Sequence, residues 1–357
     1  MLYSPIWNMN VLVNMKVLCI GNFLSRSYQA PSEMLANELS KKGLEFSLAS
    51  HFNYRLPRVI HMLYSCLTKS SRHDVAIIDV FSGPAFHWAL ACAWILHKLK
   101  CPVVLFLHGG NLPSFALSHP HRVKKLFSYA SAIVAPSQYL AAKLEPYTSK
   151  KFVLIPNGID FDSYQVKVEK QKKSIIWVRA FHRIYSPSLL IEALALLKKE
   201  LKEFGQIKVT MVGRDKDGTL LSVINKVKDF QLEETVEIIP GIPKKDIPAI
   251  LSDKEIFVNT THVDNTPVSV IEAMASKCAV ISTNVGGIPY LLENRKDALL
   301  FQPGNAQDLK NALKEILCKN SLRDEMGTQA LKKAKKMDWS FVCSEWLALL
   351  TALTSKG

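Results

Sequence analysis

The chain has 357 residues, of which 48% are hydrophobic and 21% charged, and its formal net charge is +14. A chain of this length usually folds as two domains rather than around one core. Its seven cysteines include no Cys-x-x-Cys pair, which argues against a disulfide framework or a structural zinc site.

The first fourteen residues carry neither a periodic pattern nor a signal-peptide pattern. We expect residues 1–14 to be either a short extension or the product of an upstream start, and the first strand to begin near Met15. After this point apolar runs alternate with helical patterns, which predicts parallel sheets joined by crossover helices. Strands are expected at 16–20, 45–49, 75–80, 103–107, 132–135 and 152–155, and then at 174–178, 208–212, 236–239, 255–259, 279–283 and 298–301.

The two series of strands are separated by a charged, aperiodic stretch at residues 161–173, which indicates a linker. Three helical patterns close the chain, at 305–318, 322–337 and 339–353. We therefore predict an α/β protein with a first domain at 1–160, a linker at 161–173, a second domain at 174–337 and a final helical segment at 338–357.

The most informative stretch follows the expected strand at 255–259. A helix is predicted to open at Thr266-Pro267, with a hydroxyl N-cap and proline at the first helical position. Glu272 then projects from the face that carries the open amides. Such amides suit a phosphate, and a nearby carboxylate suits a sugar or ribose hydroxyl. The pattern favours a nucleotide-sugar site, although an ordinary strand-to-helix turn of an α/β protein remains the alternative.

The stretch from Asp264 to Glu272 with its Ala-Met-Ala continuation, and the Gly286-Gly287-Ile-Pro turn, resemble the signature region of the retaining glycosyltransferases of family four. Segments 107–110, 135–140 and 155–160 fit the same family in its order. The resemblance implies the GT-B fold, in which two Rossmann-like parallel-sheet domains face a cleft and the C-terminal helix crosses back to the first domain.

The same resemblance implies a hexosyltransferase-type enzyme of polysaccharide biosynthesis. Its donor would be a nucleotide diphosphate-sugar, its acceptor a glycan or lipid-linked molecule, and no cofactor is expected. Donor sugar, base and linkage stay open. Glu272 would bind the ribose hydroxyls. Asp264 and His108 would be the catalytic residues near the transferred sugar, although a capping or core role is the alternative for His108.

The leaving diphosphate needs neutralisation by cations and amides if no metal is bound. The two Asp-x-Asp triplets at 160–162 and 215–217 are expected to form turns rather than a metal site. For Arg179 and Arg183 the alternative is an ordinary surface arginine. For Gly21 and Asn22 the alternative is a simple turn between the first strand and the next helix. The expected donor-binding residues are Arg179, Arg183, Gly21, Asn22, Thr266, Val268 and Ser269.

Three positions depart from the family pattern. Asp264 replaces a glutamate, Tyr185 stands where a lysine is usual, and Tyr290 stands where an acidic residue is usual. These departures leave open a nucleotide-sugar epimerase, which is another GT-B activity, and a non-catalytic polysaccharide-binding paralogue.

The excess of positive charge accompanies mixed basic and apolar stretches at 54–73 and 119–125. Such stretches favour an anionic membrane surface as a partner, with a solvated helix face as the alternative. No nucleic-acid-binding motif accompanies the charge, so nucleic acid is not an expected partner. The expected location is the cytoplasm, and peripheral attachment to the inner face of the plasma membrane is left open.

Overall fold

The computed structural model describes residues 15–24 and 30–355, so the predicted extension at 1–14 lies outside the described part. The chain divides into two compact units. The first unit contains the chain up to Gly158 and again from Trp339 onward, and the second unit contains Ile159–Asp338.

The first unit is built on a six-stranded parallel sheet in the order β2-β1-β3-β4-β5-β6. Alternate residues of each strand face opposite helix layers. In β4, for example, Val104 and Phe106 belong to one core and Leu105 to the other. The strands are β1 (Lys16–Ile20), β2 (Glu45–Ala49), β3 (Val75–Val80), β4 (Val103–Leu107), β5 (Ala132–Ala135) and β6 (Phe152–Leu154).

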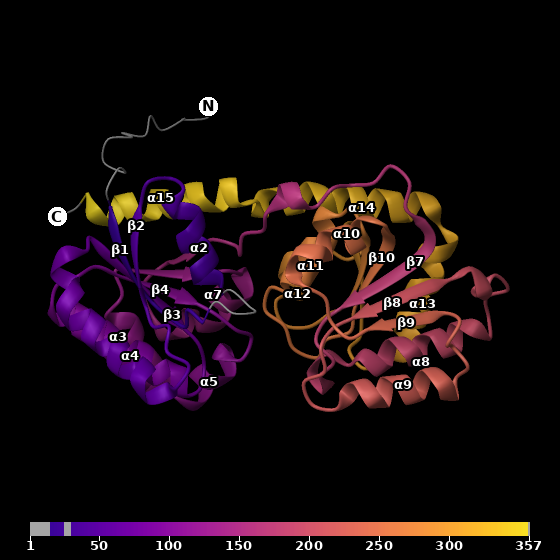
Figure 1. The fold of residues 1–357 in the computed structure, drawn as a ribbon, viewed down its shortest axis with the longest axis horizontal. Coiled ribbons are helices and arrows are strands. Elements are labelled where there is room, and N and C mark those ends of the chain that lie inside the picture. The colour runs from indigo at the N-terminus through magenta and orange to yellow at the C-terminus, as the bar shows by residue number, and fades with distance from the viewer. Residues whose placement is uncertain (1–14, 25–29, 356–357) are drawn as a thin grey trace. The chain divides into compact units, whose positions relative to one another are not determined.

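The helices of the first unit form two layers, one on each face of this sheet (Figure 1). One layer contains α2 (Pro31–Ser40) and the final helix α15 (Trp339–Thr354), whose Trp346 meets Phe106 edge-on at 5.1 Å. The final helix thus belongs to the core of the first unit. The other layer contains α3 (Arg55–Lys69), α4 (Pro84–Lys98), α5 (Leu112–Ser118), α6 (Pro120–Ser128) and α7 (Gln138–Leu144).

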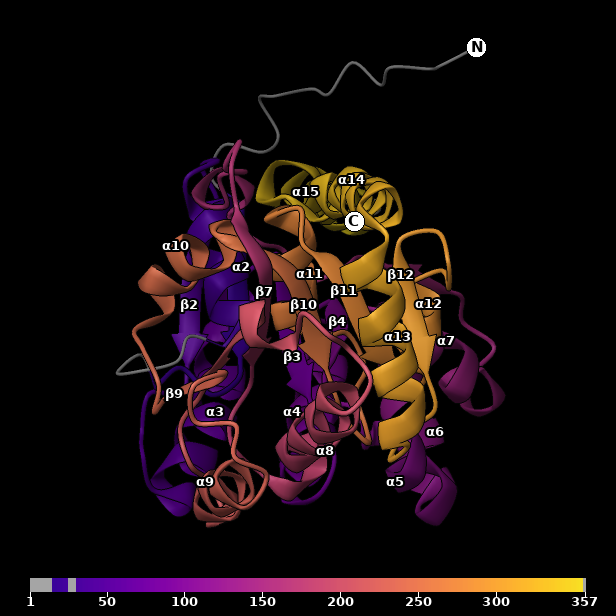
Figure 2. The ribbon, with the colours of Figure 1, turned by 90° about the vertical axis from the view of Figure 1, so that its right-hand side faces the viewer.

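The second unit repeats this architecture with a parallel sheet in the order β12-β11-β10-β7-β8-β9. Figure 2 views its strands with α8 and α13 on the near side. The strands are β7 (Gln171–Val178), β8 (Lys208–Val212), β9 (Val236–Ile239), β10 (Lys254–Asn259), β11 (Ala279–Thr283) and β12 (Ala298–Phe301). One face carries α8 (Pro187–Lys198), α9 (Thr219–Asp229) and α13 (Ala306–Cys318), and the other carries α10 (Ile247–Ser252), α11 (Val268–Ala275) and α14 (Asn320–Ala334).

Shorter elements complete the fold. The short helix α12 covers Ile288–Leu291. Single 3-10 turns lie at Ser70–Arg72, Glu145–Tyr147, Phe161–Ser163, Arg183–Tyr185, Phe204–Gln206, Lys244–Asp246 and Lys335–Met337. Across the described residues, no helix combines the length and the apolar character that crossing a bilayer requires.

The stretch predicted as a linker, 161–173, lies inside the second unit. Tyr164 is buried in its core, and β7 begins at Gln171 rather than at 174. The ammonium group of Lys170 donates to the carbonyl oxygens of Lys254 and Ser276, at 2.8 and 2.7 Å. The charged character of this stretch therefore reflects side chains that anchor it to the second unit, which a composition argument does not distinguish from a solvated linker.

Candidate functional site

Arg179 directly follows β7, at the carboxyl end of the second sheet. The neighbouring chain leaves room for it because Gly213 has no side chain: a Cβ there would lie 1.6 Å from the carbonyl oxygen of Arg179. The guanidinium forms an ion pair with Asp264 and lies 4.7 Å from the centre of the Tyr185 ring. Its Nε is buried and has no hydrogen-bond partner among the described residues. The Nε–H group of Arg179 is therefore available to donate a hydrogen bond to a ligand.

The loop that carries Asp264 is held by the glycine pair Gly286-Gly287. The amide of Gly287 donates to the carbonyl oxygen of Asp264 at 3.0 Å. A Cβ on Gly286 would lie 2.0 Å from the same oxygen, and Gly286 has a φ of +53°. A Cβ on Gly287 would lie 1.9 Å from the carbonyl oxygen of Asn265. Only glycine therefore fits this turn, and the turn fixes where Asp264 is presented.

Helix α11 begins next to this loop, and its start differs from the prediction. Pro267 has extended backbone angles, φ −69° and ψ 116°, so it is the N-cap and the helix begins at Val268. The hydroxyl of Thr266 therefore does not cap the helix. Thr266 Oγ1 and Ser269 Oγ are both buried and have no partner among the described residues. The first amides of a helix also lack an intrahelical acceptor, so this end offers unused donors to an anion.

Glu272 lies one turn further along α11 and is buried. Burial raises the pKa of its carboxyl group, while the positive charge of Lys244, a hydrogen bond from the Tyr164 hydroxyl and the charge of Arg179 act in the opposite direction. Burial likewise raises the pKa of Asp264, against the lowering effects of Arg179 and the Asn265 amide. Sequence reasoning missed Tyr164 and Lys244, because they are far from Glu272 along the chain and match no local motif.

Arg183 occupies a different environment from Arg179. Its side chain is exposed, and its backbone amide donates to Oδ2 of Asp217 at 3.1 Å. Asp215 accepts from the Gly218 amide at 3.1 Å, so both carboxylates of the triplet 215–217 shape the turn that leads into α9. Within residues 15–24 and 30–355, no three His, Cys, Asp or Glu side chains gather as metal ligands would.

The first unit places three sequence-predicted residues at the carboxyl edge of its sheet. Gly21 and Asn22 follow β1, and His108 follows β4. Nε2 of His108 lies 2.8 Å from Oδ1 of Asp79, a residue of β3 that sequence reasoning missed. The available signal was a single carboxylate within the apolar run 75–80. Gly21, Asn22 and Asp79 line one small hollow together with Phe81 and Trp88.

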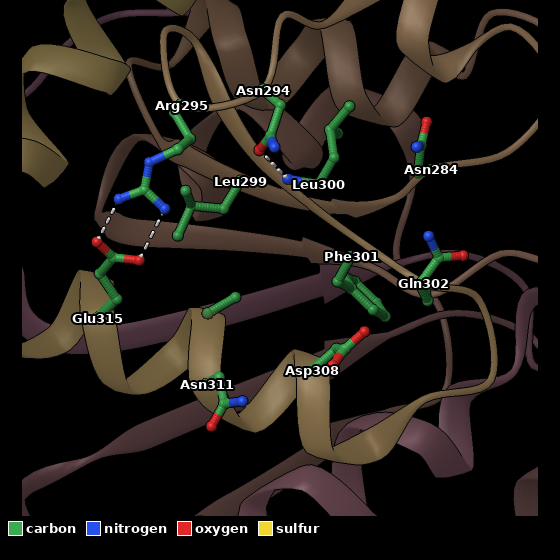
Figure 3. Close-up of a pocket in the computed structure, with 11 residues that line it drawn as sticks. Asn284, Asn294, Arg295, Leu299, Leu300, Phe301, Gln302, Asp308, Asn311 and Glu315 are labelled. Carbon is green, nitrogen blue, oxygen red and sulfur yellow. Dashed lines mark hydrogen bonds and ion pairs between the residues drawn. The ribbon is translucent and has the colours of Figure 1, made fainter.

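A larger hollow of about 320 Å³ lies beside β12 and α13, and Figure 3 shows the residues that line it. It contains none of the predicted site residues. Arg295 pairs with Glu315 at 2.7 Å, and Oδ1 of Asn294 accepts from the Leu300 amide at 2.9 Å (Figure 3). The basic side chain of this lining is therefore already paired, and the carboxylate of Asp308 also lines the hollow, so it suits a diphosphate poorly.

Two family models match the chain in succession. The model described as Glycosyltransferase Family 4 matches residues 24–163, and the model described as Glycosyl transferases group 1 matches residues 159–333. The second match contains Arg179, Asp264 and Glu272, and the first contains Asp79 and His108.

Curated relatives are distant. An uncharacterized glycosyltransferase of Methanocaldococcus jannaschii is 23% identical over 267 residues, covering 73% of this chain and 71% of the relative. The N,N'-diacetylbacillosaminyl-diphospho-undecaprenol alpha-1,3-N-acetylgalactosaminyltransferase of Campylobacter jejuni is 25% identical over 252 residues, covering 67% of this chain and 65% of the relative. The matched segments span between 54% and 71% of the length of the first six curated relatives.

The fold resembles that of a solved structure over almost its whole length. HepE of Anabaena, determined in complex with UDP, superposes with a TM-score of 0.76 at 15% identity, covering 95% of this chain and 100% of HepE. The expected GT-B fold is confirmed by this class of structural neighbour. On the two successive family matches and the shared fold, the chain belongs to the glycosyl transferases group 1 family and is a GT-B glycosyltransferase.

Proposed function

We propose that this protein transfers a hexosyl group from a nucleotide diphosphate-sugar to a glycan or lipid-linked acceptor, with retention of the anomeric configuration. The observation that carries the proposal is a set of three buried polar atoms that find no hydrogen-bond partner within the described part of the chain, Nε of Arg179, Oγ1 of Thr266 and Oγ of Ser269. Buried donors without partners cost free energy, and a bound diphosphate would satisfy all three.

The charges around these atoms suit the same ligand. A diphosphate is neutralised by a guanidinium and by amides at the start of a helix, and Arg179 and α11 supply both. Glu272 is the proposed ligand of the ribose hydroxyls, because its carboxylate is buried on the helix that begins at the phosphate-binding amides. Asp264 and His108 are the proposed catalytic residues near the transferred sugar.

The relatives support the classes of donor and acceptor. HepE has been solved with UDP and with UDP-glucose, which favours a nucleotide diphosphate-sugar donor here. The Campylobacter enzyme is named for an acceptor linked to diphospho-undecaprenol, which favours a lipid-linked acceptor. No cofactor beyond the donor is proposed.

An exposed apolar stripe on α3 supports attachment to a membrane. Leu56, Ile60, Tyr64 and Leu67 recur at intervals of four, four and three residues, which places them on one face of the helix. Their exposed fractions lie between 58% and 72%. Arg55 and Arg72 are also exposed at the two ends of this segment. We propose that the first unit binds peripherally to an anionic membrane on the cytoplasmic side, through apolar contacts and the positive charge.

Thermal denaturation with a panel of UDP, GDP and ADP, each with its sugar conjugates, tests the donor site. A ligand at 100 times its dissociation constant adds about 2.7 kcal/mol to the free energy of unfolding. One nucleotide should stabilise the protein, and Glu272→Gln should reduce that shift, while Glu293→Gln at an exposed glutamate should not.

Turnover assays separate the competing activities. Release of free nucleotide diphosphate in the presence of an acceptor supports the transferase. Conversion of the donor sugar without an acceptor would indicate the epimerase instead, and nucleotide-sugar binding without turnover would indicate the non-catalytic paralogue. If no nucleotide in the panel stabilises the protein, the proposed donor site is wrong.

A further inference from the structure

Asp79 is a buried carboxylate in the middle of the first sheet. It belongs to β3, all six residues of which are buried, and its strand neighbours Ile78 and Val80 are apolar. Burying a carboxylate is costly unless hydrogen bonds compensate for the lost hydration. An apolar residue would satisfy the packing of this strand at lower cost, so packing alone does not account for Asp79.

Both oxygens of this carboxylate have partners from other elements. Oδ1 lies 2.8 Å from Nε2 of His108, and Oδ2 accepts a hydrogen bond of 2.5 Å from the Ser32 hydroxyl, near the start of α2. The carboxylate fits because Gly21 lacks a side chain, since a Cβ there would lie 2.3 Å from Oδ2. Three segments from other parts of the first unit thus converge on Asp79.

The arrangement selects one form of the His108 ring. An ionised carboxylate can only accept hydrogen bonds, so Nε2 of His108 must carry the hydrogen that lies between them. Two aromatic rings also contact the His108 ring: Phe81 stacks on it with 4.8 Å between the ring centres, and the centre of the Phe106 ring lies 4.1 Å away with the planes at 59°. Rotation that would exchange the two nitrogens is therefore obstructed, and Nδ1 is the nitrogen that remains for a ligand.

We propose that Asp79 is a positioning residue that fixes the neutral form of the His108 ring as the Nε2–H tautomer, in which the lone pair of Nδ1 can accept a hydrogen bond from a hydroxyl of the transferred sugar. The assignment of the sugar as the ligand rests on the proposed function. The assignment of the tautomer rests only on the contacts of Asp79, and the two can be tested separately. For histidines that bind metals, loss of such an orienting partner costs about 10- to 100-fold, and we expect a factor of the same order for His108.

Nitrogen-15 NMR of the full-length protein tests the tautomer, with the His108 signals assigned by comparison with His108→Gln. In the neutral ring of the wild type, Nε2 should carry the hydrogen. In Asp79→Asn, the new amide can donate as well as accept, so the Nδ1–H form should appear. Ser32→Ala is the matched control, because it removes a hydrogen bond of the same carboxylate but leaves the contact to His108 intact. It should keep the wild-type tautomer.

Nucleotide binding and transfer test the role. Asp79→Asn should leave the dissociation constant of the stabilising nucleotide diphosphate unchanged, because its proposed ligands lie in the second unit. The kcat for the donor found in the nucleotide panel should fall about 10- to 100-fold, and the loss in Ser32→Ala should be smaller.

A wild-type His108 with the hydrogen on Nδ1 would overturn the proposal, and this measurement stands even if Asp79→Asn fails to fold. Full transfer by Asp79→Asn, or an equal loss in Ser32→Ala, would also overturn it. If no donor of the panel is turned over, the proposed function fails, while the spectrum still decides whether Asp79 fixes the ring.

Discussion

The guanidinium of Arg179 is shared between the carboxylate of Asp264 and the face of the Tyr185 ring, 4.7 Å from its centre. The two ion-pair partners are 16% and 14% exposed, so water screens their attraction only partly. Sequence reasoning gave them separate roles, Arg179 toward the diphosphate and Asp264 toward the sugar. Their pairing implies that an incoming diphosphate competes with Asp264 for the same cation.

This competition predicts an unusual effect of Asp264→Asn. The neutral side chain releases Arg179, so the affinity for the free nucleotide diphosphate should stay the same or increase. Transfer should nevertheless fall, by roughly 10²- to 10³-fold if Asp264 acts as one preorganised electrostatic group. Calorimetry of nucleotide binding alongside transfer rates measures both effects. Loss of nucleotide binding in Asp264→Asn would contradict the competition.

The two candidate arginines should behave differently. Arg179→Gln removes a partly buried cation and should weaken binding of the nucleotide diphosphate by about 10- to 150-fold, the value of a hydrogen bond to a charged group of about 1.5–3 kcal/mol. Arg183→Gln changes an exposed side chain whose role in the turn is carried by its backbone amide, so binding should change by no more than about twofold. Titration calorimetry of both variants tests the difference, and a larger loss in Arg183→Gln would transfer the role to that residue.

Glu272 should couple donor binding to stability. Burial raises the pKa of its carboxyl group, so the folded protein holds this proton more tightly than the unfolded chain does. The resulting stabilisation is fully present below the pKa of the unfolded chain and is lost as pH rises through the higher pKa of the folded state. At pH 7 to 8 Glu272→Gln should therefore raise the Tm, by roughly 2–4 °C for each kcal/mol gained in a unit of this size.

The stability advantage of Glu272→Gln should shrink as pH is lowered toward 4, where the wild-type carboxyl group is itself protonated. The same variant should bind the nucleotide less tightly at neutral pH, because glutamine lacks the negatively charged carboxylate that is proposed to accept hydrogen bonds from the ribose hydroxyls. Denaturation scans across pH, with Glu293→Gln as the exposed control, measure this. A lower Tm for Glu272→Gln at pH 8 would show that its hydrogen bond and its neighbouring charges outweigh burial.

The strands were predictable because each is a short apolar run between turns, and their observed ends differ from the predictions by at most three residues, at the start of β7. The start of α11 was not predictable in the same way, because a proline fits both the N-cap and the first helical position. Only the observed ψ of 116° at Pro267 shows that it is the N-cap. The predicted site residues were recognised from motifs that are contiguous in sequence.

The supporting residues belong to no contiguous motif, and for Asp79 the only signal was a carboxylate within an apolar run. Asp79 and His108 are 29 positions apart. Tyr164 precedes β7 in the sequence, yet it contacts Glu272 in α11. In the sequence, Tyr185 stands where the family usually has a lysine. In the structure, its ring packs against the guanidinium of Arg179. These contacts depend on which strand edges and loops the topology brings together, and a single sequence does not encode that in any one segment.

Gly286→Ala should be among the most damaging conservative changes in the chain. The new methyl group would lie 2.0 Å from the Asp264 carbonyl oxygen, at a backbone φ of +53° that disfavours side chains. We expect destabilisation of roughly 1–3 kcal/mol from backbone strain alone, and more from the steric conflict. Gly205→Ala is the control, because no atom lies within 4 Å of its Cβ position. Urea denaturation compares the two variants, and equal stability would mean that the Asp264 loop accommodates the methyl group at no cost in free energy.

The stripe on α3 predicts membrane binding that is both apolar and electrostatic. Replacing Leu56, Ile60 and Leu67 with serine should reduce binding to vesicles that contain an anionic phospholipid, because each leucine or isoleucine loses up to about 1.5–3 kcal/mol of burial in the lipid. Leu221→Ser is the matched control: this leucine of α9 is 64% exposed, within the range of the stripe, but lies in the second unit.

The electrostatic part of this binding should depend on basic residues at the two ends of the segment. Arg55→Glu with Arg72→Glu should weaken binding further, at about 1 kcal/mol for each basic residue near the surface. Binding should also decline between 0.1 and 1 M salt, as the screening length falls from about 10 Å to about 3 Å. Equal binding to neutral and anionic vesicles would remove the electrostatic part of the proposal, and an equal loss in Leu221→Ser would remove the role of α3.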